Sequence, residues 1–312
     1  MIIGFLPPYR PVVGHPGSLA RPAPGRRRWA SARSPTGVHR IDTAIHQGRQ
    51  PAGRYTVGMA ALPAAQVTLT TSGYALSLAD DHDQVEAAQR LRHQVFAAEL
   101  GATGITDPTG LDRDAFDPYC DHLLVRQEST GEVVGTYRLL PPGRTVRRYA
   151  EGEFDLTALD PLRAHLVEAG RSCVHPDHRN GAVINLMWAG ITRYLHLRNL
   201  RWLGGCASTP VADGGLAAAE VWAQARARHL APPPLRVRPL RPWFAEPGVP
   251  QEPVAATARL VPPLLRGYLR LGAWICGEPA YDPDFGAADF YVLLSMDRMN
   301  PRYLRHFLGG QP

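Results

Sequence analysis

Residues 168–183, with the sequence EAGRSCVHPDHRNGAV, combine side chains suited to acid–base and anion-binding chemistry. Glu168 is a candidate general base, and Arg171 is a candidate partner that orients it. A polar turn containing Arg179 and Gly181 then leads from a short strand into a predicted helix. A helix N-terminus offers unpaired N–H groups and a positive dipole end, and glycine lets a phosphate come close. The segment indicates a base beside an anion-binding turn, and an ordinary strand-to-helix connection fits the local pattern equally well.

An acidic loop, GLDRDAFDPYCDHLLV, precedes another predicted strand. Such loops commonly face solvent or cap helices, but carboxylates gathered at a sheet edge also favour the charged form of an ammonium group. Asp114 and Asp117 are therefore candidates for binding the amines of a substrate. Asp112 and Asp121 lie in the same stretch.

Arginines occur at positions where burial is expected. Arg138 lies inside the strand pattern VVGTYRLL, where a guanidinium is costly unless it is paired or directed at a site. Arg92 and Phe96 are four residues apart and share one face of a predicted helix. Arg92, Arg138 and Arg171 are candidates for binding a substrate carboxylate. The alternative is a structural role in which they form ion pairs with the aspartates of the acidic loop.

Metal binding and disulfides are not predicted. His175, Asp177 and His178 are three potential ligands, but no fourth ligand follows at a metal-site spacing, so a loop role is favoured. The four cysteines are widely spaced with no CxxC pair, which favours buried, reduced thiols.

The elements that must position these residues mix strand and helix patterns. Val85, Ala88, Leu91 and Val95 recur at helical spacing, whereas HLLVRQESTGEVVGTYRLL has two β-rich runs around a glycine-containing turn. We expect an α+β fold, with a mixed sheet and no internal repeat. The predicted strands are 74–80, 122–140 as a hairpin, 170–174, 202–208 and 290–296, and the predicted helices are 81–100, 181–199, 217–229 and 261–272.

The positive charge of the chain is concentrated in one region. The chain has 312 residues, 45% of them hydrophobic, and a formal charge of +6. Residues 1–58 are rich in arginine and contain one acid, Asp42, whereas the rest of the chain has slightly more acidic than basic residues. We therefore predict no nucleic-acid partner. Every basic residue is arginine, which excludes a lysine Schiff base and a P-loop lysine.

Residues 1–58 are predicted to be a disordered Arg/Pro/Gly-rich tail, because they have many prolines and glycines and no apolar period. Compact sequence begins at Met59, which suggests that translation starts there and that residues 59–312 form a single domain. No stretch reaches the roughly 18 apolar residues of a membrane span. We expect a cytoplasmic protein whose membrane contact, at the inner membrane face, is peripheral.

The ordered series Arg92-x-x-x-Phe96, Asp114-x-x-Asp117, Arg138 and Glu168-x-x-Arg171 resembles the acyl-homoserine-lactone synthases. The segments FDPYCDHLLV, GRSCVHPDHRNG and LLRGYLRLGAWICGEPAYDPDFGAADF are similar to the ornithine N-acyltransferases of ornithine-lipid synthesis, often called hemolysin-like. Both are branches of the GNAT fold. The resemblance covers roughly residues 74–308 and implies transfer of a 3-hydroxyacyl chain from acyl carrier protein to the α-amine of ornithine, giving lyso-ornithine lipid.

The resemblance implies direct aminolysis of an acyl-phosphopantetheine thioester, with no tightly bound cofactor. Backbone N–H groups around Cys173 and Val174 would polarise the thioester carbonyl. Because residues three apart on a strand face opposite sides, Glu168 and Arg171 reach one cleft only through a bulge. Ser172 lacks the glycine-flanked turn of a nucleophilic serine. The pantetheine arm and its phosphate would contact Cys173, Val174, His178, Arg179, Gly181 and Ala182.

An acidic carrier protein is expected to dock on basic residues, and a solvated surface is the alternative for those residues. Other open alternatives are acceptance of another amine, as in an autoinducer-type synthase, and a catalytically silent domain that binds an acyl chain or a carrier. One departure from relatives is His178, where an aromatic residue is common. The candidate docking arginines are Arg226, Arg228, Arg236, Arg238 and Arg241.

Overall fold

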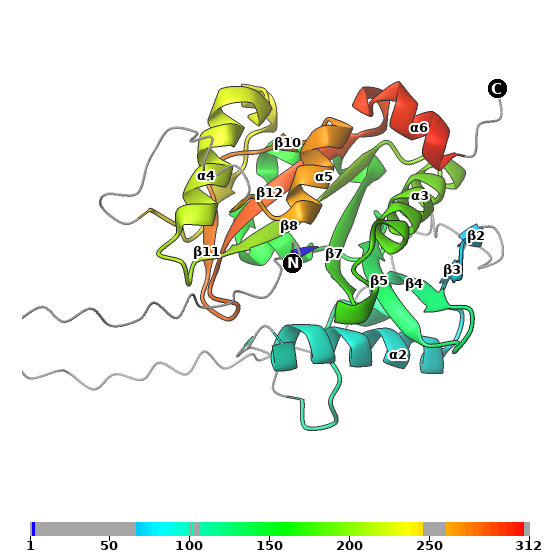
Figure 1. Ribbon diagram of the computed structural model, residues 1–312. Coiled ribbons are helices and arrows are strands. Elements are labelled where there is room, and N and C mark those ends of the chain that lie inside the picture. Colours follow the sequence, from blue (N-terminus) through cyan, green and yellow to red (C-terminus); the bar gives the residue numbers. More distant parts are fainter. Residues whose placement is uncertain (1, 4–66, 100–101, 103–106, 246–259, 309–312) are drawn as a thin grey trace, which may run out of the picture. The chain divides into compact units, whose positions relative to one another are not determined.

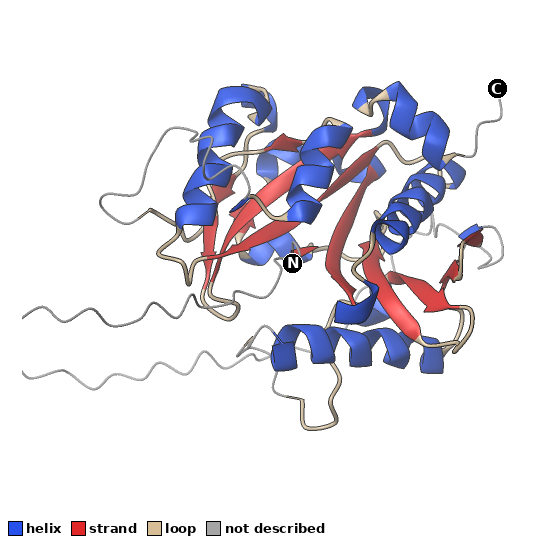
Figure 2. Cartoon of the chain, viewed as in Figure 1, coloured by secondary structure: helices blue, strands red, loops and turns tan. Residues whose placement is uncertain are grey.

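The computed structural model describes residues 2–3, 67–99, 102, 107–245 and 260–308 (Figure 1). They form a mixed sheet with helices on both faces, which confirms the predicted α+β class (Figure 2). The strands of the main sheet are β1 (Ile2–Ile3), β2 (Leu69–Thr71), β3 (Tyr74–Leu78), β4 (Asp121–Gln127), β5 (Val133–Leu140), β7 (Leu166–Val174), β8 (Trp202–Pro210), β10 (Trp274–Ile275), β11 (Ala280–Asp282) and β12 (Ala287–Ser295).

A two-stranded sheet and the helices complete the described chain. The small sheet pairs β6 (Phe154–Asp155) with β9 (Arg238–Pro239). The α-helices are α2 (His82–His93), α3 (Gly181–Leu197), α4 (Leu216–Gln224), α5 (Pro263–Leu271) and α6 (Pro301–Phe307). The π-helical turns are η1 (Gln94–Glu99) and η6 (Ala225–His229), and the 3-10 turns are η2 (Asp117–Tyr119), η3 (Tyr149–Gly152), η4 (Thr157–His165), η5 (Pro176–His178), η7 (Pro233–Leu235) and η9 (Met296–Arg298).

The main sheet divides at its centre. Its order is β10-β12-β8-β1-β7-β5-β4-β3-β2, with β11 paired to β12. β7 and β8 pair in parallel only from Leu166 to Glu168 of β7, and β1 lies between the two strands beyond that point. A Cβ atom on Gly205 would lie 2.1 Å from the Ala169 carbonyl oxygen, so glycine is required where β8 approaches β7. The two central strands therefore part just after Glu168.

The insertion of β1 departs from the prediction of a disordered tail for Ile2 and Ile3. The rest of that prediction, and the proposed start at Met59, lie outside the described residues. None of the described helices is long and apolar enough to span a bilayer.

The two faces of the sheet differ in polarity. One face packs against α3, α4 and α5 through a large apolar cluster that includes Val167, Ala169 and Phe290. The other face is covered by α2 and by the segment containing η3 and η4, and α2 lies apart from α3, α4 and α5 in Figure 1. Because side chains alternate along a strand, Glu168 and Asp289 point to this second face. The polar residues of the central strands thus face α2 and η3.

Local sequence explains where several elements begin and end. Asp81 caps α2 by accepting the Gln84 N–H at 2.8 Å. α5 has Pro263 at its first position and stops at Gly272, whose φ of 103° favours glycine. The predicted helix 81–100 is α-helical only to His93 and continues as a π-helical turn. β7 begins at Leu166, earlier than predicted; Glu168, a polar residue within the apolar pattern, lies buried inside the strand.

Candidate active site

A β-bulge in β7 brings Glu168 and Arg171 to the same face of the sheet. Cα partners across β5 and β7 are Thr136–Cys173 on one side of a register shift and Arg138–Gly170 on the other. Tyr137 therefore faces two residues, Arg171 and Ser172, and Arg171 has a left-handed φ of 50°. The bulge that these two candidate residues required is thus present, immediately after the point where β7 and β8 part.

Glu168 is buried and held by the first turn of η3. Its two carboxylate oxygens accept the backbone N–H groups of Tyr149 at 2.8 Å and Ala150 at 2.9 Å. These bonds replace the predicted orientation by Arg171, which pairs with aspartates instead. Glu168 also lines a cavity of about 10 Å³, roughly the room one water needs. We call this the inner cavity; its lining is Phe116, Cys120, Arg138, Leu140, Tyr149, Glu168, Ala169, Gly170 and Cys206.

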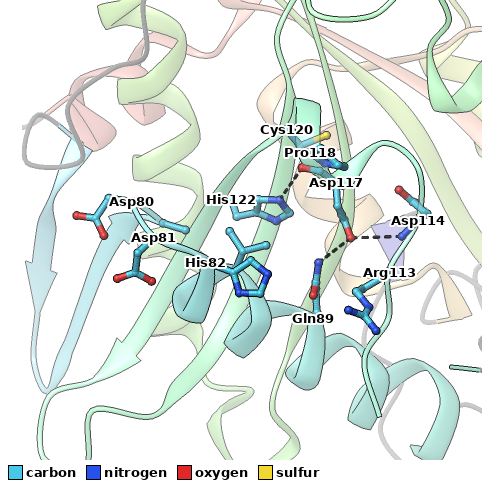
Figure 3. Close-up of a pocket in the computed structure, with 12 residues that line it drawn as sticks. Asp80, Asp81, His82, Gln89, Arg113, Asp114, Asp117, Pro118, Cys120 and His122 are labelled. Carbon is cyan, nitrogen blue, oxygen red and sulfur yellow. Dashed lines mark hydrogen bonds between the residues drawn. The ribbon is translucent and has the colours of Figure 1, made fainter. Parts of the chain in front are cut away.

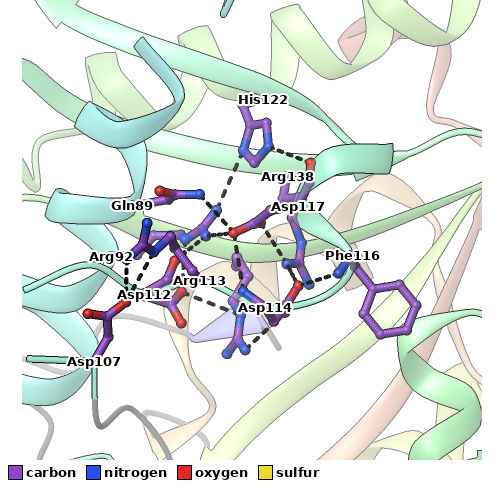
Figure 4. Close-up of polar contacts among 11 residues, drawn as sticks. Gln89, Arg92, Asp107, Asp112, Arg113, Asp114, Phe116, Asp117, His122 and Arg138 are labelled. Atoms are coloured by element: carbon purple, nitrogen blue, oxygen red, sulfur yellow. Dashed lines mark hydrogen bonds and ion pairs between the residues drawn. The ribbon is translucent and has the colours of Figure 1, made fainter. Parts of the chain in front are cut away.

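The candidate arginines and aspartates bind one another between α2, β5 and the acidic loop (Figure 4). Arg92 donates to Asp112 at 2.8 Å and to Asp117 at 2.7 Å, and its third nitrogen lies 3.5 Å from His122 Nδ1. Arg138 lies 2.7 Å from Asp114 and 2.9 Å from Asp117. Arg92 is fully buried and Arg138 nearly so. These contacts match the alternative reading of the sequence, in which the arginines form structural ion pairs with the aspartates of the acidic loop.

The network keeps its aspartates charged. Burial alone would raise the pKa of Asp114, but the Arg138 guanidinium and then Arg171 bring that pKa well below its usual range. The pKa of Asp117 is also lowered, because Arg92 and Arg138 outweigh burial. Burial, assisted by the charge of Arg92, lowers the pKa of His122 to about 4, so its imidazole is neutral at physiological pH.

Arg171 differs from Arg92 in having donors to spare. Its Nη2 lies 3.3 Å from Asp114 and its Nε lies 3.5 Å from Asp112, whereas Nη1 is buried without a hydrogen-bond partner among the described residues. Its guanidinium lies over the rings of Tyr149, at 5.4 Å, and Phe285, at 5.5 Å. A buried N–H group without a hydrogen-bond partner lowers the stability of the fold, so this guanidinium is suited to donate hydrogen bonds to an anionic group of a ligand.

Phe96 and Cys173 lie in a small apolar cluster with Leu91 and Val95. Phe96 is fully buried and contacts the Phe285 ring edge-to-face, with the ring centroids 6.3 Å apart. The side chains of Phe96 and Cys173 therefore pack on the face of the sheet that α2 covers, next to the bulge. Both lie in the core and contribute packing at this site.

The turn after β7 has its own hydrogen bonds. Asn180 Oδ1 accepts the N–H groups of Ala182 at 3.1 Å and Val183 at 3.3 Å, which caps α3. Arg179 Nε donates to the carbonyl of Val174 at 3.2 Å. Space beside Gly181 is open. The N–H group of Ala182, which belongs to the candidate phosphate site, is thus already bonded to Asn180.

The histidines of this turn contact separate partners. His178 Nδ1 lies 3.0 Å from the Tyr74 hydroxyl, and His175 Nε2 lies 3.1 Å from the Gln94 amide nitrogen. Asp177 is exposed, with its carboxylate 3.9 Å from His175. No disulfide joins the four cysteines, which all lie in the described part of the chain, and all but Cys120 are buried.

Two larger cavities adjoin the site. One, which we call the outer cavity, has a volume of about 660 Å³ and shares Phe116 and Tyr149 with the inner cavity. The other is an open groove of about 550 Å³ beside α2, on the outside of Asp114 and Asp117 (Figure 3). Asp117 in that groove is already bonded to Gln89 and Arg92. The groove shares Cys120 with the inner cavity, whereas the outer cavity shares two residues with it, Phe116 and Tyr149.

Sequence reasoning missed several residues of the site. Phe116 and Tyr149 line both the inner and the outer cavity, and their rings are 5.8 Å apart. Glu153 and Asp289 lie on the same side of the sheet as Glu168. No local motif marks these residues, because they come from a loop and from the last long strand. An acid inside the apolar run AADFYVLLS was the one available signal for Asp289.

The bulged strand, the parted sheet and the following turn define a GNAT-type N-acyltransferase, and a model of the acetyltransferase (GNAT) domain matches residues 91–189. The L-ornithine N(alpha)-acyltransferase of Rhodobacter capsulatus is 37% identical over 74% of this chain and 93% of the relative. The enzyme of that name from Brucella abortus is 32% identical over 80% of this chain and 97% of the relative. The chain belongs to the L-ornithine N(alpha)-acyltransferase family, as the resemblance indicated.

Among solved structures, the chain is similar to the acyl-homoserine lactone synthase BjaI with SAM and isopentyl-CoA. The two are 18% identical, with a TM-score of 0.45, over 72% of this chain and 81% of that chain.

Proposed function

We propose that this protein transfers a 3-hydroxyacyl group from the phosphopantetheine thioester of an acyl carrier protein to the α-amine of L-ornithine. The products are lyso-ornithine lipid and the free carrier thiol. The observation that carries the proposal is the bulge at Arg171, which places Glu168 and Arg171 on one face where β7 and β8 part. The named ornithine acyltransferases among its relatives support ornithine as the acceptor.

The acceptor amino acid enters through the outer cavity and passes Phe116 and Tyr149. Arg171 binds its carboxylate through Nη1, which has no hydrogen-bond partner among the described residues. Glu168 removes a proton from the α-ammonium, directly or through one water in the inner cavity, which frees the amine to attack. Arg92 and Arg138 then act as positioning residues, because they fix the aspartates that hold Arg171.

The acyl donor occupies the gap between β7 and β8, and β1 leaves that gap when the donor binds. Backbone N–H groups near Cys173 and Val174 polarise the thioester carbonyl, and the amine nitrogen bonds to the carbonyl carbon. The carbon–sulfur bond then breaks, and the second proton lost by the amine nitrogen goes to the leaving sulfur, which gives the free thiol. The phosphate of the arm displaces the Asn180 cap from the start of α3. Arg179, Gly181 and Ala182 then hold it, with His178 beside them.

The carrier protein docks on exposed arginines of the segment from η6 to residue 241. Arg226, Arg228, Arg236, Arg238 and Arg241 are all exposed, and Arg241 also lines the outer cavity. Their positive charge suits an acidic carrier and would raise the rate of encounter more than the final affinity. Charge reversal at Arg226 and Arg228 should raise the KM for acyl carrier protein and leave the KM for ornithine unchanged.

Mass spectrometry of the reaction mixture tests the function. The full chain is incubated with 3-hydroxyacyl carrier protein or 3-hydroxyacyl-CoA and with L-ornithine or another amino acid. An Nα-acyl-ornithine formed faster from the carrier protein than from CoA is the expected result. Transfer to another amine with ornithine untouched would keep the chemistry and reject the acceptor, and no transfer at all would favour a silent binding domain.

A further inference from the structure

Three potential ligand groups meet on the face that carries Glu168. They are the carboxylate of Glu153, just after η3, the carboxylate of Asp289 on β12, and the thiol of Cys206 on β8. One oxygen or sulfur atom from each lies within 4.8 Å of the others. We call this group the acid pair, meaning Glu153 and Asp289, with Cys206 beside it.

The acid pair has unused hydrogen-bonding capacity. Asp289 is 0% exposed, and among the described residues its carboxylate oxygens accept no N–H group, so that the carboxyl group of Glu153 is its hydrogen-bond partner. One oxygen of Glu153 likewise accepts no N–H group from the described part of the chain. Burial, followed by the negative charge of Asp289, raises the pKa of Glu153 to about 10. Two adjacent carboxyl groups that share a proton in a buried place favour a cation that can replace that proton.

The acid pair is within reach of an acceptor. Glu153 lines the outer cavity, and Cys206 lines the inner cavity that contains Glu168. Tyr149 borders both cavities and lies under the Arg171 guanidinium. A molecule that reaches Glu168 from the outer cavity therefore passes Glu153, and Asp289 lies behind Glu153, within 4.8 Å of it.

We propose that the acid pair binds the side-chain ammonium of a basic amino-acid acceptor. This inference rests on the proposed function, and it assigns to that site the group that selects an acceptor with a second amine. A single nitrogen hydrogen-bonded at about 2.8–3.0 Å can touch oxygens as far apart as those of Glu153 and Asp289. The reacting amine is a poor occupant, because paired carboxylates hold an amine in its charged, unreactive form.

A divalent cation is the competing occupant. Glu153, Cys206 and Asp289 supply three ligands, whereas a structural zinc site has four. Cys206 is fully buried in an apolar cluster with Leu166 and Tyr291, and burial raises the pKa of its thiol far above the usual value. A thiol that resists deprotonation is a weak metal ligand, so the cluster suits an ammonium better.

Calorimetric titration of the full chain tests this assignment without requiring acyl transfer. L-Ornithine is compared with L-norvaline, which has the same carbon chain and lacks the side-chain amine. Hydrogen bonds to a charged group predict that ornithine binds about 10- to 100-fold more tightly. Asp289→Asn and Glu153→Gln should each remove most of that ratio. Asp160→Asn is the control, because this exposed carboxylate pairs with Arg163 away from the cavities.

The outcomes separate the inference from the proposed function. A preference for ornithine that falls at least fivefold in both acid-pair variants and persists in Asp160→Asn supports the inference, even in a protein that transfers no acyl group. Equal binding of ornithine and norvaline, or a preference that both variants keep, overturns it. Stoichiometric Zn²⁺ in the purified protein that is lost in Asp289→Asn also overturns it. Acylation of ornithine together with either overturning result leaves the proposed function standing.

Discussion

Replacing Glu168 by glutamine tests the proposed base directly. The carboxylate accepts two backbone N–H groups, at 2.8 and 2.9 Å, and an amide can accept only one of them. The remaining N–H of η3 would face an NH₂ group, so we expect a loss of about 1–3 kcal/mol in the free energy of unfolding. Loss of a general base lowers turnover by roughly 10²–10⁴-fold. Turnover should therefore fall much further than stability or substrate affinity.

Glu151→Gln is the matched control. The Glu151 carboxylate also accepts a backbone N–H, from Arg148 at 3.1 Å, but it does not line either cavity. Release of free thiol from the acyl donor gives kcat and the KM for each substrate, and urea denaturation gives the stability of each variant. A kcat for Glu168→Gln within twofold of the Glu151→Gln value would refute a catalytic role for Glu168.

Three further predictions concern the arginine network, pH and β1. Arg138→Met should lower the free energy of unfolding by about 1.5–3 kcal/mol, because it removes the guanidinium that bridges Asp114 and Asp117 and leaves Arg171 and Arg92 as their remaining arginine partners. Arg163→Met, at a guanidinium that is 37% exposed, should cost about 0–1 kcal/mol, and equal losses in urea denaturation would contradict the argument. The pKa of His122 lies at about 4 in the folded state against 6.5 for a free imidazole. Between these values the unfolded chain takes up a proton that the folded chain refuses, so stability should fall as pH falls from 6.5 to 4, and His122→Gln should reduce that slope in thermal unfolding. Removal of residues 1–58 takes β1 out of the gap between β7 and β8, so the KM for the acyl donor should fall, by at most about tenfold for a strand of two residues. An unchanged KM would show that the donor binds elsewhere.

Much of the secondary structure could be predicted from the sequence, because the signals for turns and helix ends are local. The hairpin around Gly131 and the end of α5 at Gly272 depend on turn and capping residues a few positions apart. The strong resemblance of the motifs from Arg92 to Gly181 was also enough to indicate the family. Local periodicity did not reveal that β7 extends back to Leu166, because a buried glutamate interrupts the apolar pattern.

The roles of the charged residues depended on tertiary structure. The sequence placed Arg92, Arg138, Asp114 and Asp117 together but left substrate binding and ion pairing equally open. Because α2 packs against β5, these arginines and aspartates form ion pairs with one another. Nη1 of Arg171 is left without a hydrogen-bond partner among the described residues.

From the sequence alone we could predict the fold class, most of the long strands and helices, and the presence of Glu168 and Arg171 in one short segment. Only the tertiary structure decided that a bulge turns both side chains to one face, and that Glu153, Cys206 and Asp289 meet beside them. Capping, turns and strand alternation depend on residues a few positions apart, so they can be recognised in the sequence. A register shift depends on pairing between strands, and a charge cluster depends on elements far apart in the chain.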